Sequence, residues 1–252
     1  MLKEIRQASL GIIVVFSALT LSACGGGGGS SGSEPKAQST DLKPGVFYIG
    51  RVFTDGSRKE GISFLSPTGK FVAILDLVDF GTLTFSDSGQ FSGQIEEYNL
   101  GDFSGPTSGT LSGEVKSSKE ANLTASKTDF AANGLLFRND TLSDLGVTFE
   151  ELSGSYTITN STPWINIGPT GEVTGGDEKC VFNGQVVIPD KTINVFELTY
   201  KASSCPPLPE ENATESVRNG DFSGLGTYDP SVGEVLFYAR NGTVAWMFKG
   251  KR

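Results

Sequence analysis

The side chains that could do chemistry in this chain are mainly carboxylates and cysteines, because histidine is absent. Without histidine there is no Ser-His-Asp or Cys-His catalytic group, no histidine ligand for zinc, and no side chain that ordinarily titrates near neutral pH. Glu96 and Glu97 are adjacent, whereas glycosidases need two carboxylates that face each other across the bond they cleave. Neighbours on a strand point to opposite faces, so these two do not form such a pair. We therefore predict no catalytic residue, no metal site and no cofactor.

Cys24 is expected to carry a lipid anchor. A charged start and an apolar stretch lead to Leu21-Ser22-Ala23-Cys24, which resembles a bacterial lipobox. This order predicts a lipoprotein signal peptide over residues 1–23, with the Cys24 thiol acylated after cleavage. The Gly- and Ser-rich residues 24–44 cannot bury enough surface to fold and predict a flexible tether to the membrane. Gly25 after the cysteine indicates the outer membrane, by resemblance to the usual sorting rule in Gram-negative bacteria; the face of that membrane stays open.

Cys180 and Cys205 are the two cysteines that remain in an exported chain, so we predict a disulfide between them. A loop of about 25 residues would stabilise the fold by roughly 3.5 kcal/mol in the chain-entropy model. A redox role is disfavoured, because catalytic dithiols usually have the Cys-x-x-Cys spacing.

Two further pairs of residues are candidates for a site inside a β-domain. Arg51 shares a strand face with apolar residues, and Glu97 ends another apolar stripe, so the two are candidates for an ion pair closing one end of a barrel. The alternative is that both are solvated strand ends. Trp164 and Trp246 are candidate aromatic residues facing a ligand, although a tryptophan in a β-domain more often belongs to the core.

Low charge, frequent glycine and short runs rich in Val, Ile, Thr, Phe and Tyr predict many short strands joined by tight turns. Breakers such as Asp55-Gly56 and Pro67-Thr68-Gly69 separate most of the runs. We predict strands at 46–53, 61–65, 71–77, 82–86, 90–97, 103–115, 121–125, 135–137, 154–159, 164–167, 172–174, 181–188, 195–201, 221–228, 234–239 and 243–249. The fold class is therefore all-β.

The strands fall into two series, and we predict an N-terminal β-domain at 45–145 and a C-terminal β-domain at 150–252. Thr148-Phe149-Glu150-Glu151 between them fits a capping box that opens a single helical turn. Each domain is expected to be a small antiparallel meander barrel or a half-open sandwich.

The two series share short strings in the same order, which indicates a duplicated domain. Chance recurrence in Gly-rich strands is the alternative. The strings are Gly45-Val46-Phe47 and Gly154-Ser155-Tyr156, Pro67-Thr68-Gly69 and Pro169-Thr170-Gly171, Phe91-Ser92-Gly93 and Phe182-Asn183-Gly184, and the identical Gly-Asp-Phe-Ser-Gly at 101–105 and 220–224.

The C-terminal half carries a set of motifs in a fixed order: Gly154-Ser155-Tyr156, Pro169-Thr170-Gly171, Cys180-Val181-Phe182-Asn183-Gly184, Cys205 and Asp221-Phe222-Ser223-Gly224-Leu225-Gly226. With these motifs, residues 150–252 resemble a family of uncharacterised proteobacterial lipoproteins whose C-terminal half is a small, lipocalin-like antiparallel β-domain. The resemblance implies a fold and a membrane-anchored location but no activity. Pro206 to Glu215 departs from the short connection of the family, and its prolines and acids predict a solvated loop.

The sequence thus favours an outer-membrane lipoprotein that acts as a non-catalytic binding or interaction module for an unknown small ligand or envelope protein. The net charge of −9 disfavours nucleic acid as a partner. The alternatives are a structural accessory of an envelope complex and a carboxylate-based enzyme acting on glycans. A lined lumen would favour ligand binding, and an exposed apolar patch would favour the accessory.

Overall fold

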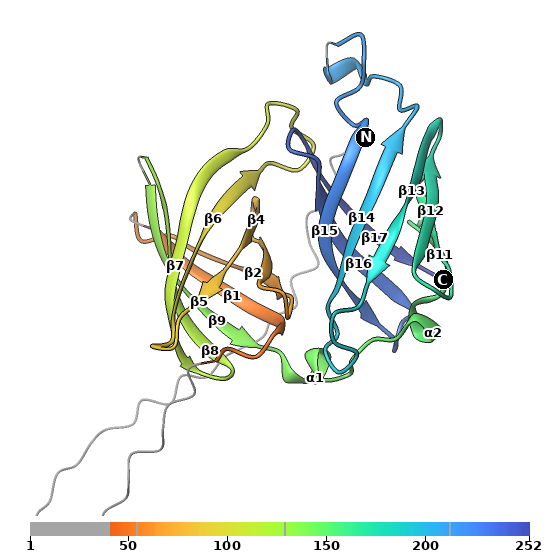
Figure 1. The fold of residues 1–252 in the computed structure, drawn as a ribbon. Coiled ribbons are helices and arrows are strands. Elements are labelled where there is room, and N and C mark those ends of the chain that lie inside the picture. The colour runs from red at the N-terminus through yellow and green to blue at the C-terminus, as the bar shows by residue number, and fades with distance from the viewer. Residues whose placement is uncertain (1–40, 54, 129, 212) are drawn as a thin grey trace, which may run out of the picture. The chain divides into compact units, whose positions relative to one another are not determined.

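The computed structural model describes residues 41–53, 55–128, 130–211 and 213–252. Cys24, the predicted signal peptide and the tether up to residue 40 lie outside the described residues. The described residues belong to one compact unit, which contains two closed, eight-stranded antiparallel barrels (Figure 1). The prediction of an all-β fold with two tandem small barrels is confirmed. Within the described part, no helix has both the length and the apolar character needed to cross a membrane.

The first barrel is a meander in which every strand pairs with an antiparallel neighbour. Its strands are β1 (Gly45–Phe53), β2 (Arg58–Leu65), β3 (Lys70–Ile74), β4 (Val78–Thr82), β5 (Thr84–Phe85), β6 (Gln90–Tyr98), β7 (Thr107–Ser117), β8 (Glu120–Lys127) and β9 (Phe130–Arg138). Pairing of β1 with β9 and of β4 with β6 closes the ring, and the short β5 pairs with β6 beside it. The sequence analysis missed β4 as a separate strand.

The second barrel has the same plan without the extra strand. Its strands are β10 (Gly154–Thr157), β11 (Trp164–Ile167), β12 (Glu172–Asp177), β13 (Cys180–Val187), β14 (Phe196–Ser203), β15 (Gly220–Asp229), β16 (Glu234–Arg240) and β17 (Ala245–Lys251). The ring closes where Thr157 on β10 pairs with Lys251 on β17. A 3-10 turn, η1 (Pro209–Glu211), lies in the connection between β14 and β15.

Two short helices, α1 (Asp140–Ser143) and α2 (Phe149–Leu152), join the barrels (Figure 1). The predicted capping box is confirmed at α2: the Thr148 hydroxyl accepts from the Glu151 amide, and the Glu151 carboxylate accepts from the Thr148 amide at 3.0 Å. The sequence analysis missed α1, which is capped by the Asn139 side chain.

Alternation along the strands decides which side chains fill each interior. On β14, Phe196, Leu198 and Tyr200 belong to the core of the second barrel, as predicted. The same core includes Val244 and Phe248 near and on β17, with Trp246 packed against it. The first barrel has its own interior cluster, which includes Phe47, Ile49, Phe91 and Leu111.

Both barrels begin and end with the same arrangement of a glycine and an arginine. Gly45 and Gly154 open the first strands with φ values of +147° and +150°. The last strands lead to Arg138, whose Nε donates to the Pro44 carbonyl at 2.8 Å, and to Arg252, whose Nη1 donates to the Ser153 carbonyl at 3.1 Å. A Cβ at Gly45 would lie 2.5 Å from Ser143 Oγ, and one at Gly154 would lie 2.7 Å from Arg252 Cδ. The positive φ values also favour glycine at both positions.

The shared strings are only partly equivalent in space. Pro67-Thr68-Gly69 and Pro169-Thr170-Gly171 both form the turn after the second strand of their barrel. Phe91-Ser92-Gly93, however, lies on the fifth strand of its ring and Phe182-Asn183-Gly184 on the fourth. The Gly-Asp-Phe-Ser-Gly string at 101–105 is a loop, and its copy at 220–224 is strand. The glycine and arginine at the first and last strands of each barrel therefore support duplication better than the later strings do.

An apolar cluster between the two barrels, the inter-barrel cluster, joins outward-facing residues of both. Phe64 on β2 and Tyr238 on β16 meet at its centre, with ring centroids 6.3 Å apart. Its buried members are Val46, Phe64, Val72, Val78, Phe80, Tyr98, Val195, Leu225, Tyr238 and Ala245. Burial of this surface stabilises the two barrels against each other.

A polar contact at the edge of this cluster is built around Glu197 on β14. Its carboxylate accepts from the hydroxyls of Ser66 and Thr68 at 2.6 and 2.5 Å and from Lys70 Nζ at 2.5 Å. All three donors lie at the β2–β3 turn of the first barrel. Burial raises the pKa of Glu197, but the hydrogen bonds outweigh burial, and the pKa is lowered from its ordinary value.

The lowered pKa of Glu197 gives a test of this contact by pH. We predict that Glu197→Gln lowers the free energy of unfolding by about 1–2 kcal/mol at pH 7, because charged hydrogen bonds are weakened. The carboxylate stabilises the fold above its ordinary pKa of 4.5, and this contribution is lost as pH falls through the lower folded pKa. Urea unfolding of both proteins should therefore show a difference that shrinks below about pH 4.5. A difference that stays constant with pH, or equals that of the exposed control Glu120→Gln, would contradict this role.

Candidate functional site

A partly open cavity of about 230 Å³ lies inside the second barrel. It lies at the barrel end where the β10–β11, β12–β13, β14–β15 and β16–β17 connections meet, and every strand from β11 to β17 contributes to its wall. The wall is mainly apolar. Its residues are Ile158, Ser161, Pro163, Ile165, Val173, Asp177, Cys180, Phe182, Tyr200, Ala202, Cys205, Arg218, Phe222, Phe237, Trp246, Met247 and Phe248.

Aromatic rings from neighbouring strands form most of this wall. Tyr200 stacks on Phe222, with ring centroids 4.9 Å apart and planes 3° apart, because the two face each other in the β14–β15 register. Phe182 lies 5.5 Å from Tyr200 on its other neighbouring strand, and Phe237 stacks on Phe248 at 5.2 Å. These packed rings give the cavity flat apolar surfaces that are held in fixed positions.

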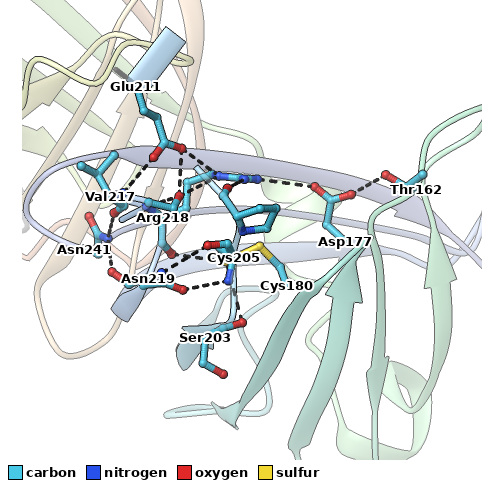
Figure 2. Close-up of a disulfide and its surroundings, with 12 residues drawn as sticks. Thr162, Asp177, Cys180, Ser203, Cys205, Glu211, Val217, Arg218, Asn219 and Asn241 are labelled. Atoms are coloured by element: carbon cyan, nitrogen blue, oxygen red, sulfur yellow. Dashed lines mark hydrogen bonds and ion pairs between the residues drawn. A yellow bond between two sulfur atoms is a disulfide. The ribbon is translucent and has the colours of Figure 1, made fainter. Parts of the chain in front are cut away.

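The predicted disulfide between Cys180 and Cys205 is confirmed and lies in the cavity wall. It joins the first residue of β13 to the segment that follows β14, and Figure 2 shows it beside Arg218 and Asp177. The bridge therefore holds the rim at the point where the β14–β15 connection leaves the barrel.

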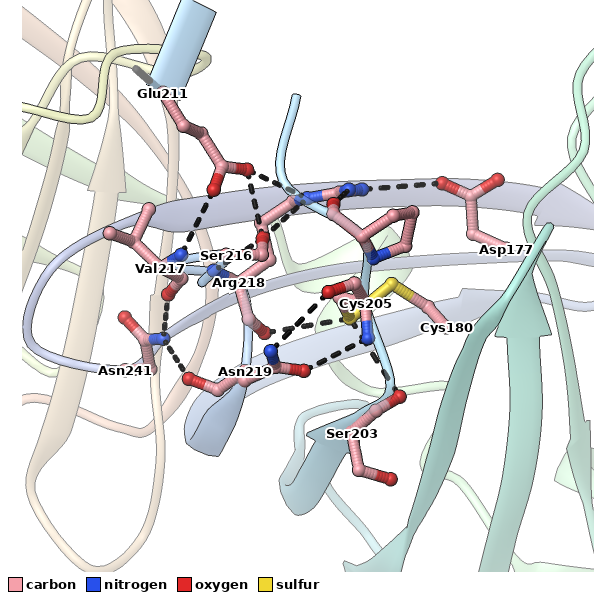
Figure 3. Close-up of polar contacts among 11 residues, drawn as sticks. Asp177, Cys180, Ser203, Cys205, Glu211, Ser216, Val217, Arg218, Asn219 and Asn241 are labelled. Atoms are coloured by element: carbon pink, nitrogen blue, oxygen red, sulfur yellow. Dashed lines mark hydrogen bonds and ion pairs between the residues drawn. A yellow bond between two sulfur atoms is a disulfide. The ribbon is translucent and has the colours of Figure 1, made fainter. Parts of the chain in front are cut away.

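Arg218 forms the polar part of this rim. Its Nε donates to Glu211 Oε1 at 3.1 Å and to the Ser216 hydroxyl at 3.2 Å, and its Nη2 donates to the Pro206 carbonyl (Figure 3). Its Nη1 lies 3.9 Å from a carboxylate oxygen of Asp177. Arg218 is thus placed between two carboxylates, and the rim carries no excess positive charge.

The β14–β15 connection is braced internally by Glu211, whose side chain is fully buried at 0% exposure. Besides Arg218, the Glu211 carboxylate accepts from the Val217 amide at 3.0 Å and from the Ser216 hydroxyl at 2.9 Å (Figure 3). The prediction of a solvated loop is therefore wrong for Glu211, because this acid has an arginine seven residues later that composition alone does not reveal.

The two tryptophans occupy different places. Trp246 lines the cavity, whereas Trp164 is 45% exposed and lies outside the cavity wall. On β11 the inward positions are taken by Ile165 and Ile167, so Trp164 points to the outer face. Of the two candidates, the geometry keeps Trp246 as a ligand-facing residue and removes Trp164.

Arg51 and Glu97 lie on inward faces of the first barrel, but each takes another partner. Arg51 Nη2 donates to Asp79 Oδ2 at 2.6 Å, and Glu97 accepts from Lys127. Asp79 lies opposite Glu97 in the β4–β6 register. Asp79 is therefore the acid that pairs with Arg51, in place of the predicted Glu97. Burial raises the pKa of Asp79, although Arg51 favours its charged form. The sequence analysis missed Asp79 because it did not recognise β4.

Glu96 and Glu97 diverge, as their alternation on β6 requires. Glu96 lies on the outside, 3.0 Å from Arg240 Nη1 of the second barrel, and accepts from the Tyr98 hydroxyl. Among the described residues, no group of three or more His, Cys, Asp or Glu side chains could hold a metal ion.

A comparison with models of known protein families gives no match to this chain, and a comparison with curated proteins gives none either.

Loss of the disulfide should loosen the cavity rim. We predict that Cys180→Ser lowers the free energy of unfolding by about 2–4 kcal/mol, because the reduced unfolded chain regains conformational entropy. Denaturant unfolding followed by Trp246 fluorescence, in a Trp164→Phe background, would measure this. Addition of reductant to the parent protein should reproduce the effect and leave the variant unchanged. Equal stability of variant and parent would show that the bridge does not constrain the fold.

Proposed function

We propose that this chain is an exported lipoprotein, anchored at the outer membrane through Cys24, whose second barrel binds a small apolar ligand. The observation that carries the proposal is the aromatic cavity between the disulfide, Trp246 and Tyr200. Ligand sites in proteins are typically concave and apolar, with a few polar groups that fix orientation. Here the polar groups are Arg218 and Asp177 at the rim and the Tyr200 hydroxyl in the wall.

The volume of the cavity limits the size of the ligand that can bind. An apolar cavity of about 150 Å³ accepts one benzene ring, and the cavity here measures about 230 Å³. A molecule of about two fused rings is therefore the size that the second barrel favours.

The interior of the first barrel supports a structural role for that barrel. Its apolar core is packed with large side chains such as Phe47, Phe91 and Leu111, all at most 3% exposed. The Arg51–Asp79 pair lies in the same interior. This difference between the barrels supports the proposal that the ligand binds in the C-terminal half of the chain.

A role as a structural accessory of an envelope complex is the second candidate, and one surface favours it. Tyr48 and Val52 on β1 and Leu135 and Phe137 on β9 are all more than 40% exposed. They are neighbours on the outer face, because Tyr48 pairs with Phe137 and Gly50 with Leu135. Exposed apolar patches of this kind occur at protein–protein contacts. A glycan-active enzyme is disfavoured because Glu96 and Glu97 diverge.

Binding can be tested with 2-fluoronaphthalene and fluorine NMR on the chain from Gly25 onward, which keeps every described residue. We expect a shifted or broadened fluorine resonance that saturates with protein. Ala202→Leu, which fills part of the cavity, should weaken binding by about tenfold or more. Trp164→Phe on the outer face is the matched control and should bind as the parent does. Absence of binding, or equal binding by Ala202→Leu, would refute the proposed site.

The anchor can be tested separately in cells. Cys24→Ser should abolish incorporation of a clickable fatty acid, because the thiol is the group that forms the thioether. The protein should then appear as uncleaved precursor or as a released form in membrane fractionation. Fatty-acid labelling that persists in Cys24→Ser would contradict the lipoprotein assignment.

A further inference from the structure

Tyr200 and Tyr238 are the two buried tyrosines whose hydroxyls have no hydrogen-bond partner among the described residues, and of the two only Tyr200 lines the cavity. Tyr200 is 8% exposed. In the same barrel, the buried Tyr156 hydroxyl donates to the Leu152 carbonyl at 2.8 Å. The Tyr200 hydroxyl is open to the cavity, so a polar group that arrives there can become its hydrogen-bond partner. Burial also raises the pKa of Tyr200, so the phenol stays protonated at neutral pH and can both donate and accept.

The charges around the cavity argue against a charged ligand. Asp177 and Arg218 are the charged side chains among the described lining residues, and both lie at the rim. Arg218 is already bonded to Glu211, Ser216 and a backbone carbonyl. An anion would have to displace the buried Glu211, and a charge deeper in the barrel would lose its hydration among aromatic rings without a counter-ion.

We infer that the ligand is an uncharged molecule of about two rings that carries one oxygen, and that this oxygen pairs with the Tyr200 hydroxyl in the cavity. Phenols, alcohols and ketones of this size meet the requirement. This inference rests on the proposed function. It adds the polarity of the ligand and names Tyr200 as the residue that binds the ligand's oxygen. Hydrocarbon contacts with Phe182, Phe222 and Trp246 hold the rings, and Tyr200 sets their orientation.

The test compares naphthalene with 2-naphthol by isothermal titration calorimetry, on the chain from Gly25 onward and on its Tyr200→Phe variant. In the parent, the ratio of the naphthalene Kd to the 2-naphthol Kd should be about 3–10 times larger than in Tyr200→Phe, as expected for one hydrogen bond. Naphthalene itself should bind both proteins alike. Tyr156→Phe removes a hydroxyl that already has a partner, and it should leave the ratio unchanged.

A third ligand, the anion 2-naphthoate, tests whether the cavity prefers an uncharged molecule. We expect 2-naphthoate to bind at least about tenfold more weakly than 2-naphthol, because its carboxylate has no free cation to meet. Equal ratios in the parent and in Tyr200→Phe, or tightest binding of 2-naphthoate, would overturn the inference while leaving the cavity intact. Failure of all three ligands to bind the parent would overturn the proposed function as well.

A second measurement keeps the test independent of how Tyr200→Phe folds. In the parent labelled with ¹³C at the tyrosine ζ carbon, one resonance should shift further with 2-naphthol than with naphthalene, because ring packing acts in both complexes and the hydrogen bond in only one. Equal shifts with both ligands would contradict a hydrogen bond to Tyr200.

Discussion

A closed barrel of eight strands has an interior whose width is fixed by strand number and tilt, and inward side chains must fill it. The two barrels of this chain meet that constraint differently. The first fills its interior with large apolar side chains and the buried Arg51–Asp79 pair. The second fills one part with stacked rings and leaves a cavity of about 230 Å³ at the end near Cys205. The proposed function follows from this difference in filling.

Buried charges connect parts of the chain that are distant in sequence. Glu197 of the second barrel is held by donors at the β2–β3 turn of the first, beside the inter-barrel cluster. Arg218, held by Glu211 within the β14–β15 connection, lies 3.9 Å from Asp177 of β12. An uncompensated charge in such a place would cost several kcal/mol, so each acid depends on its partner. The disulfide and the Arg218–Asp177 contact therefore join the β14–β15 connection to the same part of the rim, at the β12–β13 end.

Much of the fold could be predicted from the sequence, because period-two alternation and Gly- or Pro-containing turns are local signals. The strand Trp164–Ile167 was predicted correctly for this reason, and the capping box was predicted from the local motif at Thr148. The disulfide was predicted because Cys180 and Cys205 are the cysteines that remain after Cys24. Partners across the barrel could not be predicted, since they depend on register. Arg51 contacts Asp79 because β4 pairs with β3 and β6 in the ring. The cavity itself depends on the balance of side-chain volumes from seven strands, which no short window of sequence contains.

The central claim is that the second barrel holds a small apolar molecule among its aromatic side chains. Crystals of the chain from Gly25 onward, soaked with 1-bromonaphthalene and measured at the bromine absorption edge, test it most directly. The account predicts an anomalous peak inside the second barrel, between Trp246 and the Tyr200–Phe222 stack. Bromine found only on outer faces or between molecules, with side chains filling the cavity, would contradict it.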